Sequence, residues 1–324
     1  MINYFIGIRL GEKYVKIRAA DETMNMQDSR RVPVTASMSP DKFLGTVEQG
    51  IFSLLKAGRI PMGRVSGIAV SAPATIDYEK GGIGCSSVIP SLNGINIKEK
   101  LTKSMKKFVV VETEANALAY SEQKLGHTNG YKNFVLILLE KKISAGIYLN
   151  GSLIRNRNGS TSELGHIIIE SHGRKCSCSN RGCLEAYASS DAIVRYYMKY
   201  KGGATGGRIT FDDVYRLAQK SDNAALDSFY RMGNYLGIAM TTIINLISPE
   251  AIIFSGKVSK AMRFFLPAVE STLSARAYSL PLKGIVYKKS GLSEDEVMKG
   301  LIHLAQDSYN NAYDLRINDD IFYI

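Results

Sequence analysis

Three of the four cysteines in this chain lie within eight residues, and this cluster constrains the fold more than any other feature of the sequence. They are Cys176, Cys178 and Cys183, and His166 precedes the first of them by ten residues. Three thiolates and one imidazole satisfy a tetrahedral zinc ion, and such a closed site is structural rather than catalytic. A redox-active cluster or a set of plain buried thiols is the alternative interpretation of the cysteines alone. We expect the apolar run 167–169 to be a strand that anchors the histidine.

Strand-like and helix-like segments alternate along most of the chain, which favours an α/β fold. The first helix is predicted over 40–56, because Ser39 is a good N-cap and Pro40 suits the first helical position. The other expected helices are 97–105, 114–125, 185–197, 211–219, 223–246, 259–276 and 293–307. The expected strands are 3–10, 13–19, 67–71, 108–111, 133–139, 144–150, 251–255 and 284–288, with a hairpin turn near Asn150-Gly151.

The alternation of elements runs twice, and each round opens with a hairpin. We therefore expect an N-terminal α/β domain over 1–120 and a C-terminal α/β domain over 121–292 that carries the cysteine loop. The helix at 293–308 is expected to pack back on the first domain. Residues 309–324 show no interpretable pattern.

The chain has a formal net charge of +11, from 41 Lys and Arg against 30 Asp and Glu. The charges are dispersed, which indicates a solvated surface rather than a dedicated anion-binding face. The densest group is Lys98, Lys100, Lys103, Lys106 and Lys107, and it fits the exposed side of a helix. No apolar run approaches the roughly 18 residues of a membrane helix, and no signal peptide is visible. We expect a cytoplasmic protein with no membrane association.

The spacing around the cysteines resembles the signature of the ROK family of sugar kinases and sugar-responsive regulators. The pattern is Glu-x-Gly-His, then Cys-x-Cys, four residues, and Cys-x-Glu; it runs from Glu163 to Glu185, with Ser179 where the family usually has glycine. The resemblance extends from about residue 4 to about residue 308. It implies two actin-like ATPase (ribonuclease-H-like) domains with a cleft between them. It also implies a structural zinc ion held by His166, Cys176, Cys178 and Cys183.

The resemblance further implies that Glu163, His166 and Glu185 contact a sugar, since carboxylates accept charge-assisted hydrogen bonds from hydroxyl groups. The alternative for the two glutamates is support of the zinc loop. Other sugar-contacting segments depart from the family pattern. They are 71–74 (Ser-Ala-Pro-Ala), 88–92 (Val-Ile-Pro-Ser-Leu) and 112–116 (Glu-Thr-Glu-Ala-Asn).

The segments that handle ATP in the family depart further. The first phosphate loop, Asp-x-Gly-Gly-Thr, corresponds to Arg-Leu-Gly-Glu-Lys at 9–13, and the second, Gly-Thr-Gly-x-Gly, to Glu-Lys-Lys-Ile-Ser at 140–144. Glycines let backbone amides approach phosphates closely. Gly11 remains in the first loop, and Gly256 remains from the adenosine-side Gly-Gly-Gly, which corresponds to Ser255-Gly256-Lys257. Glu114 stands at the position of the catalytic aspartate, and its longer side chain displaces the carboxylate. Lys13, Lys141 and Lys142 offer charge to phosphates, so residual ATP and magnesium binding stays an alternative.

The sequence therefore favours a non-catalytic ROK protein that binds a sugar or related small ligand and acts in regulation. The first alternative is an active ATP-dependent hexose or N-acetylhexosamine kinase that uses Glu114 as base. The second is a zinc-stiffened interaction protein without a small ligand. Because the first strand begins near residue 3, we expect no helix-turn-helix and no direct DNA binding. The resemblance implies a homodimer or homotetramer.

Overall fold

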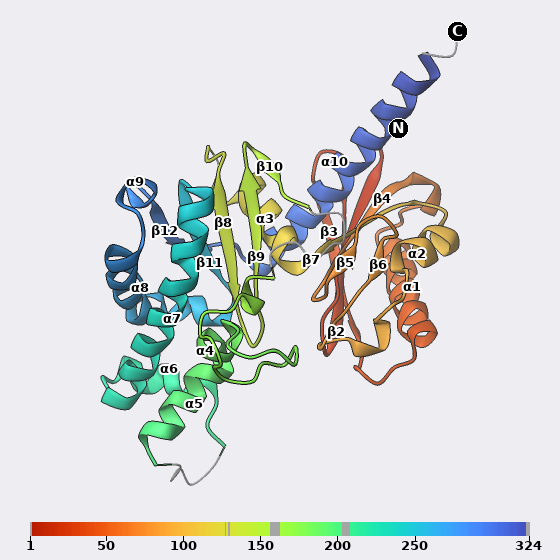
Figure 1. Cartoon of the computed structure of the whole chain (residues 1–324). Helices are drawn as coiled ribbons and strands as arrows, with labels where there is room; N and C mark the ends of the chain where they lie inside the picture. Colours follow the sequence, from red (N-terminus) through yellow and green to blue (C-terminus); the bar gives the residue numbers. More distant parts are fainter. Residues whose placement is uncertain (1, 127, 129, 156–162, 203–207, 322–324) are drawn as a thin grey trace. The chain divides into compact units, whose positions relative to one another are not determined.

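The computed structural model describes residues 2–126, 128, 130–155, 163–202 and 208–321 (Figure 1). The chain forms two compact units. The first comprises Met1–Asn129, Leu153–Thr161 and Gly291–Ile324, and the second comprises Gly130–Ser152 and Ser162–Ser290. Each unit is built on a five-stranded mixed sheet with helices, so the predicted α/β class is confirmed. Among the described residues, no helix combines the length and apolar character needed to span a bilayer.

The sheet of the first unit has the strand order β3-β2-β1-β4-β7. Its strands are β1 (Tyr4–Arg9), β2 (Tyr14–Asp21), β3 (Met26–Pro33), β4 (Val65–Ala72) and β7 (Phe108–Thr113). The meander β1–β2–β3 is antiparallel, whereas β4 pairs in parallel with both β1 and β7. This pairing explains why β4 is buried along nearly its whole length. A small hairpin of β5 (Ile76–Asp77) and β6 (Gly82–Ile83) lies outside the sheet.

The helices of the first unit are α1 (Pro40–Ala57), α2 (Ile97–Met105), α3 (Glu114–Leu125) and α10 (Glu294–Ile321), with short 3-10 turns at Met62–Arg64 and Pro90–Leu92. The predicted N-cap of α1 is confirmed, because the Ser39 side chain accepts a hydrogen bond from the amide of Lys42. The C-terminal helix α10 packs against α3, β1 and β4. A charged cluster ties its first turn to the sheet, where the nearly buried Lys16 ammonium lies 3.1 Å from Glu294 and 3.4 Å from Asp295.

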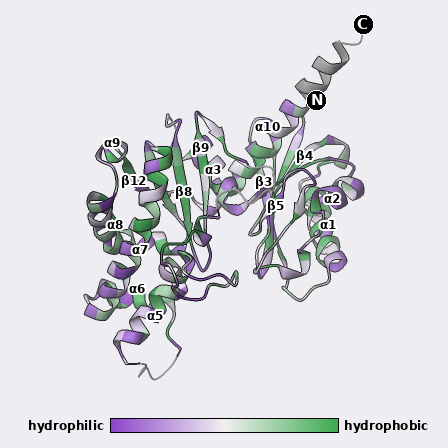
Figure 2. Ribbon diagram, viewed as in Figure 1, coloured by the Kyte–Doolittle hydropathy of each residue, from purple (hydrophilic) through white to green (hydrophobic). Residues whose placement is uncertain are grey.

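The sheet of the second unit has the strand order β10-β9-β8-β11-β12. Its strands are β8 (Phe134–Leu139), β9 (Ile143–Leu149), β10 (Ser152–Leu153), β11 (Ala251–Ser255) and β12 (Val286–Lys289). Strand β8 is fully buried, and Figure 2 shows it as a continuous hydrophobic stretch. The predicted turn at Asn150-Gly151 is confirmed, and both residues have positive φ, as a tight hairpin turn requires.

The helices of the second unit are α4 (Glu185–Ala188), α5 (Ser190–Tyr200), α6 (Phe211–Gln219), α7 (Asn223–Ile247), α8 (Met262–Arg276) and α9 (Ser279–Leu282). Two 3-10 turns, η3 (Leu164–His166) and η4 (Lys257–Ala261), precede the cysteine loop and α8. Helices α7 and α8 make the most extensive helix–helix contact in the chain. Gly233 and Gly237, one turn apart on α7, allow α8 to approach closely.

The secondary structure differs from the expectations in four places. The predicted helix 185–197 is broken at Ser189, which ends α4 and caps the start of α5. Its side chain accepts a hydrogen bond from the amide of Ala192. The predicted strand 167–169 does not form; instead a single bridge joins Ile168 to Cys183, and His166 ends a 3-10 turn. Strand β3 was missed because its sequence, Met-Gln-Asp-Ser-Arg-Arg-Val-Pro, is polar, as suits an edge strand. The last helix also continues past the expected end at 307, to Ile321.

The close contact of α7 with α8 yields a stability prediction. Gly→Ala in a helix ordinarily stabilises by about 0.5–1 kcal/mol, but a Cβ at Gly233 would lie 2.4 Å from the carbonyl oxygen of Phe265. We expect Gly233→Ala to destabilise the chain by about 2 kcal/mol. The control is Gly45→Ala in α1, where a Cβ would meet nothing within 4 Å. Calorimetry should show a lower Tm for the first variant and an equal or higher Tm for the second; equal Tm values for both would contradict the packing argument.

Candidate functional site

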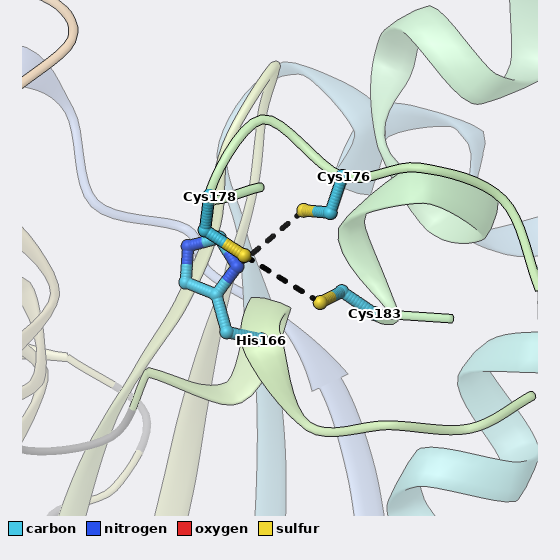
Figure 3. A group of neighbouring side chains, drawn as sticks. All are labelled: His166, Cys176, Cys178 and Cys183. Atoms are coloured by element: carbon cyan, nitrogen blue, oxygen red, sulfur yellow. Dashed lines mark hydrogen bonds between the residues drawn. The ribbon is translucent and has the colours of Figure 1, made fainter. Parts of the chain in front are cut away.

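The four predicted metal ligands come together in the second unit. One ligand atom from each of His166, Cys176, Cys178 and Cys183 lies within 4.8 Å of all the others. The Cys178 and Cys183 sulfur atoms are 3.7 Å apart, and Cys176 Sγ lies 3.6 Å from His166 Nδ1. Figure 3 shows the three sulfur atoms and the imidazole directed toward one another. A tetrahedral zinc ion with ordinary bond lengths places sulfur and nitrogen ligands about 3.6–3.8 Å apart, so the donor set and its spacing fit zinc.

The loop that carries these ligands (residues 166–183) is held by backbone constraints. The amide of Cys176 donates to Asn180 O (2.8 Å), and that of Ser179 donates to Cys176 O (3.1 Å), which closes a tight turn between the ligands. Ser179 has a φ of 73°, a left-handed conformation that glycine adopts more readily. Gly182 has a φ of 79°, and a Cβ there would lie 1.9 Å from the carbonyl oxygen of Glu170. The geometry of the loop therefore requires glycine at 182 and strains serine at 179.

The environments of the thiols differ. Burial raises the pKa of Cys183 to about 12. Although burial acts in the same direction at Cys178, hydrogen bonds from the Asn180 backbone and from the neighbouring thiols lower the pKa of the Cys178 thiol below its usual value. A bound cation would favour the thiolate at all three positions.

The predicted sugar contacts surround this cluster. Glu163 Oε2 lies 3.9 Å from His166 Nε2. The other ring nitrogen of His166, Nδ1, is the one near the Cys176 sulfur. Burial raises the pKa of the Glu163 carboxyl. Glu185 Oε1 lies 4.0 Å from Cys176 Sγ and accepts hydrogen bonds from Ser177 Oγ (2.8 Å) and Lys142 Nζ (3.1 Å). The ion pair between Lys142 and Glu185 was missed at the level of sequence, where 43 residues separate the two.

The position predicted for the catalytic base lies in the first unit and is engaged in an ion pair. Glu114 is the first residue of α3, and its Oε1 accepts from an Arg9 guanidinium nitrogen at 2.5 Å. Burial opposes the charge on Arg9, but the attraction of Glu114 outweighs it and raises the pKa of the guanidinium. The sequence showed both exchanges, Arg for Asp and Glu for Asp, but not that the two new side chains bind each other.

A second carboxylate of the same segment, Glu112, is fully buried. It accepts hydrogen bonds from Arg155 Nε (2.6 Å), Asn116 Nδ2 (3.1 Å) and the Tyr78 hydroxyl. This polar cluster satisfies the carboxylate that the strand β7 delivers into the interior. Arg155 and Tyr78 carried no sequence signal, because nothing in their local pattern indicates a buried partner.

The two remnant glycines have structural reasons to be retained. A Cβ at Gly11 would lie 2.8 Å from Tyr14 O. Gly256 has a φ of 83°, and a Cβ there would lie 2.6 Å from Leu139 O. Next to it, the amide of Lys257 donates to Glu140 Oε1 at 2.6 Å. The amide that follows the remnant glycine is thus already hydrogen-bonded to a carboxylate of the chain, that of Glu140.

The two α/β units and the cysteine-histidine loop define an actin-like α/β protein of the kind found among sugar kinases and sugar-responsive repressors. The chain matches the ROK family over residues 5–308 and belongs to that family. The predicted family and fold are confirmed.

Relatives of both kinds are similar to the chain. It is 26% identical over 311 residues to the xylose repressor of Bacillus subtilis, which covers 94% of this chain and 78% of the repressor. It is 27% identical over 303 residues to the glucokinase of Halalkalibacterium halodurans, which covers 90% of this chain and 92% of the kinase. A crystal structure of a ROK family transcriptional regulator, a homologue of the E. coli MLC protein, matches with a TM-score of 0.85 at 26% identity, over 94% of this chain and 78% of that chain.

The backbone of the cysteine loop gives a paired prediction. Ser179→Gly removes the left-handed strain and should stabilise the second unit by about 0.5–1 kcal/mol. Gly182→Ala adds a Cβ against the Glu170 carbonyl and should destabilise it by about 2 kcal/mol or more. Calorimetry of the two variants checks both signs. A Ser179→Gly protein less stable than the parent would show that the serine side chain, rather than its strain, dominates.

Proposed function

We propose that the chain binds a sugar-type ligand and does not transfer a phosphoryl group. The observation that carries this proposal is the 2.5 Å ion pair between Arg9 and Glu114. A general base must take a proton from the attacking hydroxyl, and here the carboxylate oxygen accepts a charge-assisted hydrogen bond from a guanidinium instead. Arginine also replaces the carboxylate that, by the family resemblance, would help to hold magnesium.

The Glu140–Lys257 contact supports the same proposal. Phosphoryl transfer depends on backbone amides and cations that are open to the phosphates. Where the family has glycines, this chain has a carboxylate at 140, and that carboxylate accepts a hydrogen bond from the Lys257 amide (2.6 Å). An incoming phosphate would have to displace the Glu140 carboxylate from this amide, and the two negative groups would repel each other.

The ligand side of the proposal rests on the carboxylates around the cysteine loop. Glu163 and Glu185 are the residues that would accept hydrogen bonds from sugar hydroxyls, and His166 would present its Nε2 edge to the same ligand. The names of the relatives, a xylose repressor, N-acetylglucosamine repressors and glucokinases, support a sugar as ligand. The alternative is an active sugar kinase, and the similarity to glucokinases is what favours it.

We propose that zinc organises this site. His166 Nδ1 and the thiolates of Cys176, Cys178 and Cys183 would hold the ion, which supplies a structural cross-link and no chemical step. Glu163, near the opposite imidazole nitrogen, would orient the ring.

The zinc proposal predicts about one zinc ion per purified chain. Cys183→Ser should lose the metal and lower the Tm of the second unit, because the serine hydroxyl is a poor zinc ligand and Cys183 is fully buried. Metal analysis and calorimetry check this, with Cys85→Ser as control, since Cys85 is exposed and lies outside the cluster. Full zinc content in Cys183→Ser would contradict the ligand set.

The functional proposal predicts that magnesium-ATP leaves the Tm unchanged and that no ADP forms with glucose, N-acetylglucosamine or N-acetylmannosamine. A sugar that binds should raise the stability by about 2.7 kcal/mol at one hundred times its Kd. Glu163→Gln should abolish this shift, whereas Glu170→Gln, an exposed carboxylate of the same loop, should keep it. Sugar-dependent ADP release would refute the non-catalytic proposal and establish the kinase; a chain that responds to no sugar would refute the ligand-binding half.

A further inference from the structure

A cavity of about 390 Å³ lies within the second unit, beside the cysteine loop. Its walls come from the β8–β9 turn, the cysteine loop, α4 and the start of α5. Five basic residues line it, against two acidic ones, Glu185 and Asp191. The basic residues are Lys141, Lys142, Arg174, Lys175 and Arg195.

The two arginines form one preorganised wall. Arg174 Nη1 and Arg195 Nη2 both donate to the carbonyl oxygen of Ala186, at 3.3 and 2.8 Å, so the two guanidinium groups lie side by side. The Arg174 guanidinium also lies over the rings of Tyr187 and Tyr196, 4.7 Å from each centroid, which fixes its plane. Adjacent planar guanidinium groups with remaining N–H donors suit an oxyanion with several acceptor oxygens.

The basic charges of this cavity are only partly balanced by the protein. Within the part of the chain that the structure describes, Lys142 is the one basic residue of the five with a carboxylate in ion-pair distance, that of Glu185. Like charges that converge on one cavity repel each other, and a bound anion relieves that repulsion. The N-cap of α5, Ser189, also lines the cavity, so the positive end of that helix adds to the potential.

We propose that this cavity binds a phosphate monoester of a sugar or another polyol. Arg174 and Arg195 receive the phosphate, and the Glu185 and Asp191 carboxylates accept hydrogen bonds from hydroxyl groups. The proposal names the ligand class of the sugar-binding role above and rests on it. A nucleoside triphosphate fits the cavity less well, because the two carboxylates that line it repel the larger negative charge of a triphosphate more strongly.

The test measures binding by calorimetric titration, without ATP. The ligands are glucose, N-acetylglucosamine and N-acetylmannosamine, their 6-phosphates, inorganic phosphate, and separately magnesium-ATP. We expect at least one phosphate ester to bind at least tenfold more tightly than its parent sugar, from its added charge-assisted hydrogen bonds. It should also bind more tightly than inorganic phosphate, which lacks hydroxyl groups, and added salt should weaken its binding.

The variant that tests the basic lining is the double substitution Arg195→Gln with Lys175→Gln, which removes two of the five cationic side chains of the cavity, both at exposed positions. It should weaken binding of the ester at least tenfold. The matched control is Arg181→Gln, an exposed arginine of the same loop that also donates to a backbone carbonyl, Gly173 O, but lies outside the cavity; it should change the affinity less than about twofold. Circular dichroism and metal content verify that all variants fold.

The inference would be overturned by equal affinity for sugar and ester, by equal affinity for ester and inorganic phosphate, by tighter binding of magnesium-ATP than of any ester, or by an unchanged affinity in the double variant. A protein that binds no ester and no phosphate would also overturn it. These outcomes are separate from those for the proposed function. Binding of a neutral sugar alone would keep that function and remove the phosphate site, whereas ADP release would refute the non-catalytic proposal whatever the cavity binds.

Discussion

The convergence of four ligand atoms within 4.8 Å is the constraint on which the surroundings of the candidate site depend. To bring Cys176, Cys178 and Cys183 to one point, the chain turns tightly and accepts left-handed backbone at Ser179 and Gly182. The same loop, together with the residues that flank it, also positions four further groups of the site. Glu163 precedes His166, Glu185 follows Cys183, and Arg174 and Lys175 immediately precede Cys176. A change in the loop is therefore a change in the whole site.

Several charged side chains at positions where the family resemblance implies glycine or aspartate are bound by the protein itself. Arg9 pairs with Glu114, Glu140 accepts from the amide of Lys257, and Lys142 pairs with Glu185. Each contact gives a charged group a partner within the protein. The three contacts are consistent with the proposal that this chain does not transfer a phosphoryl group.

Much of the fold could be predicted from sequence because local signals and packing agree. Helices α2, α3 and α6 and strand β11 were predicted to the residue, from caps and from apolar runs of the right length.

The failures occurred where tertiary context decides. Ser189 breaks an otherwise helical segment, β3 is a polar edge strand, and the run 167–169 follows the course of the cysteine loop instead of joining a sheet. The cluster of His166 with the three cysteines could be predicted because the spacing of these residues is a local pattern. The pairs Arg9–Glu114 and Lys142–Glu185 could not, since their partners are 105 and 43 residues apart and nothing local marks them.

The position of Arg174 has a mechanical consequence. Its guanidinium lies against Tyr187 of α4 and Tyr196 of α5, and both of those rings also lie beside Tyr235 of α7, with centroids 4.4 and 6.5 Å apart. One planar cation and three phenol rings thus form a continuous column that joins three helices. Any displacement of that cation must be absorbed by the rings, and α7, which carries the last of them, is also the helix that packs most extensively on α8. Because close-packed interiors transmit strain, a displacement of Arg174 in the cysteine loop changes ring contacts in α4, α5 and α7 together.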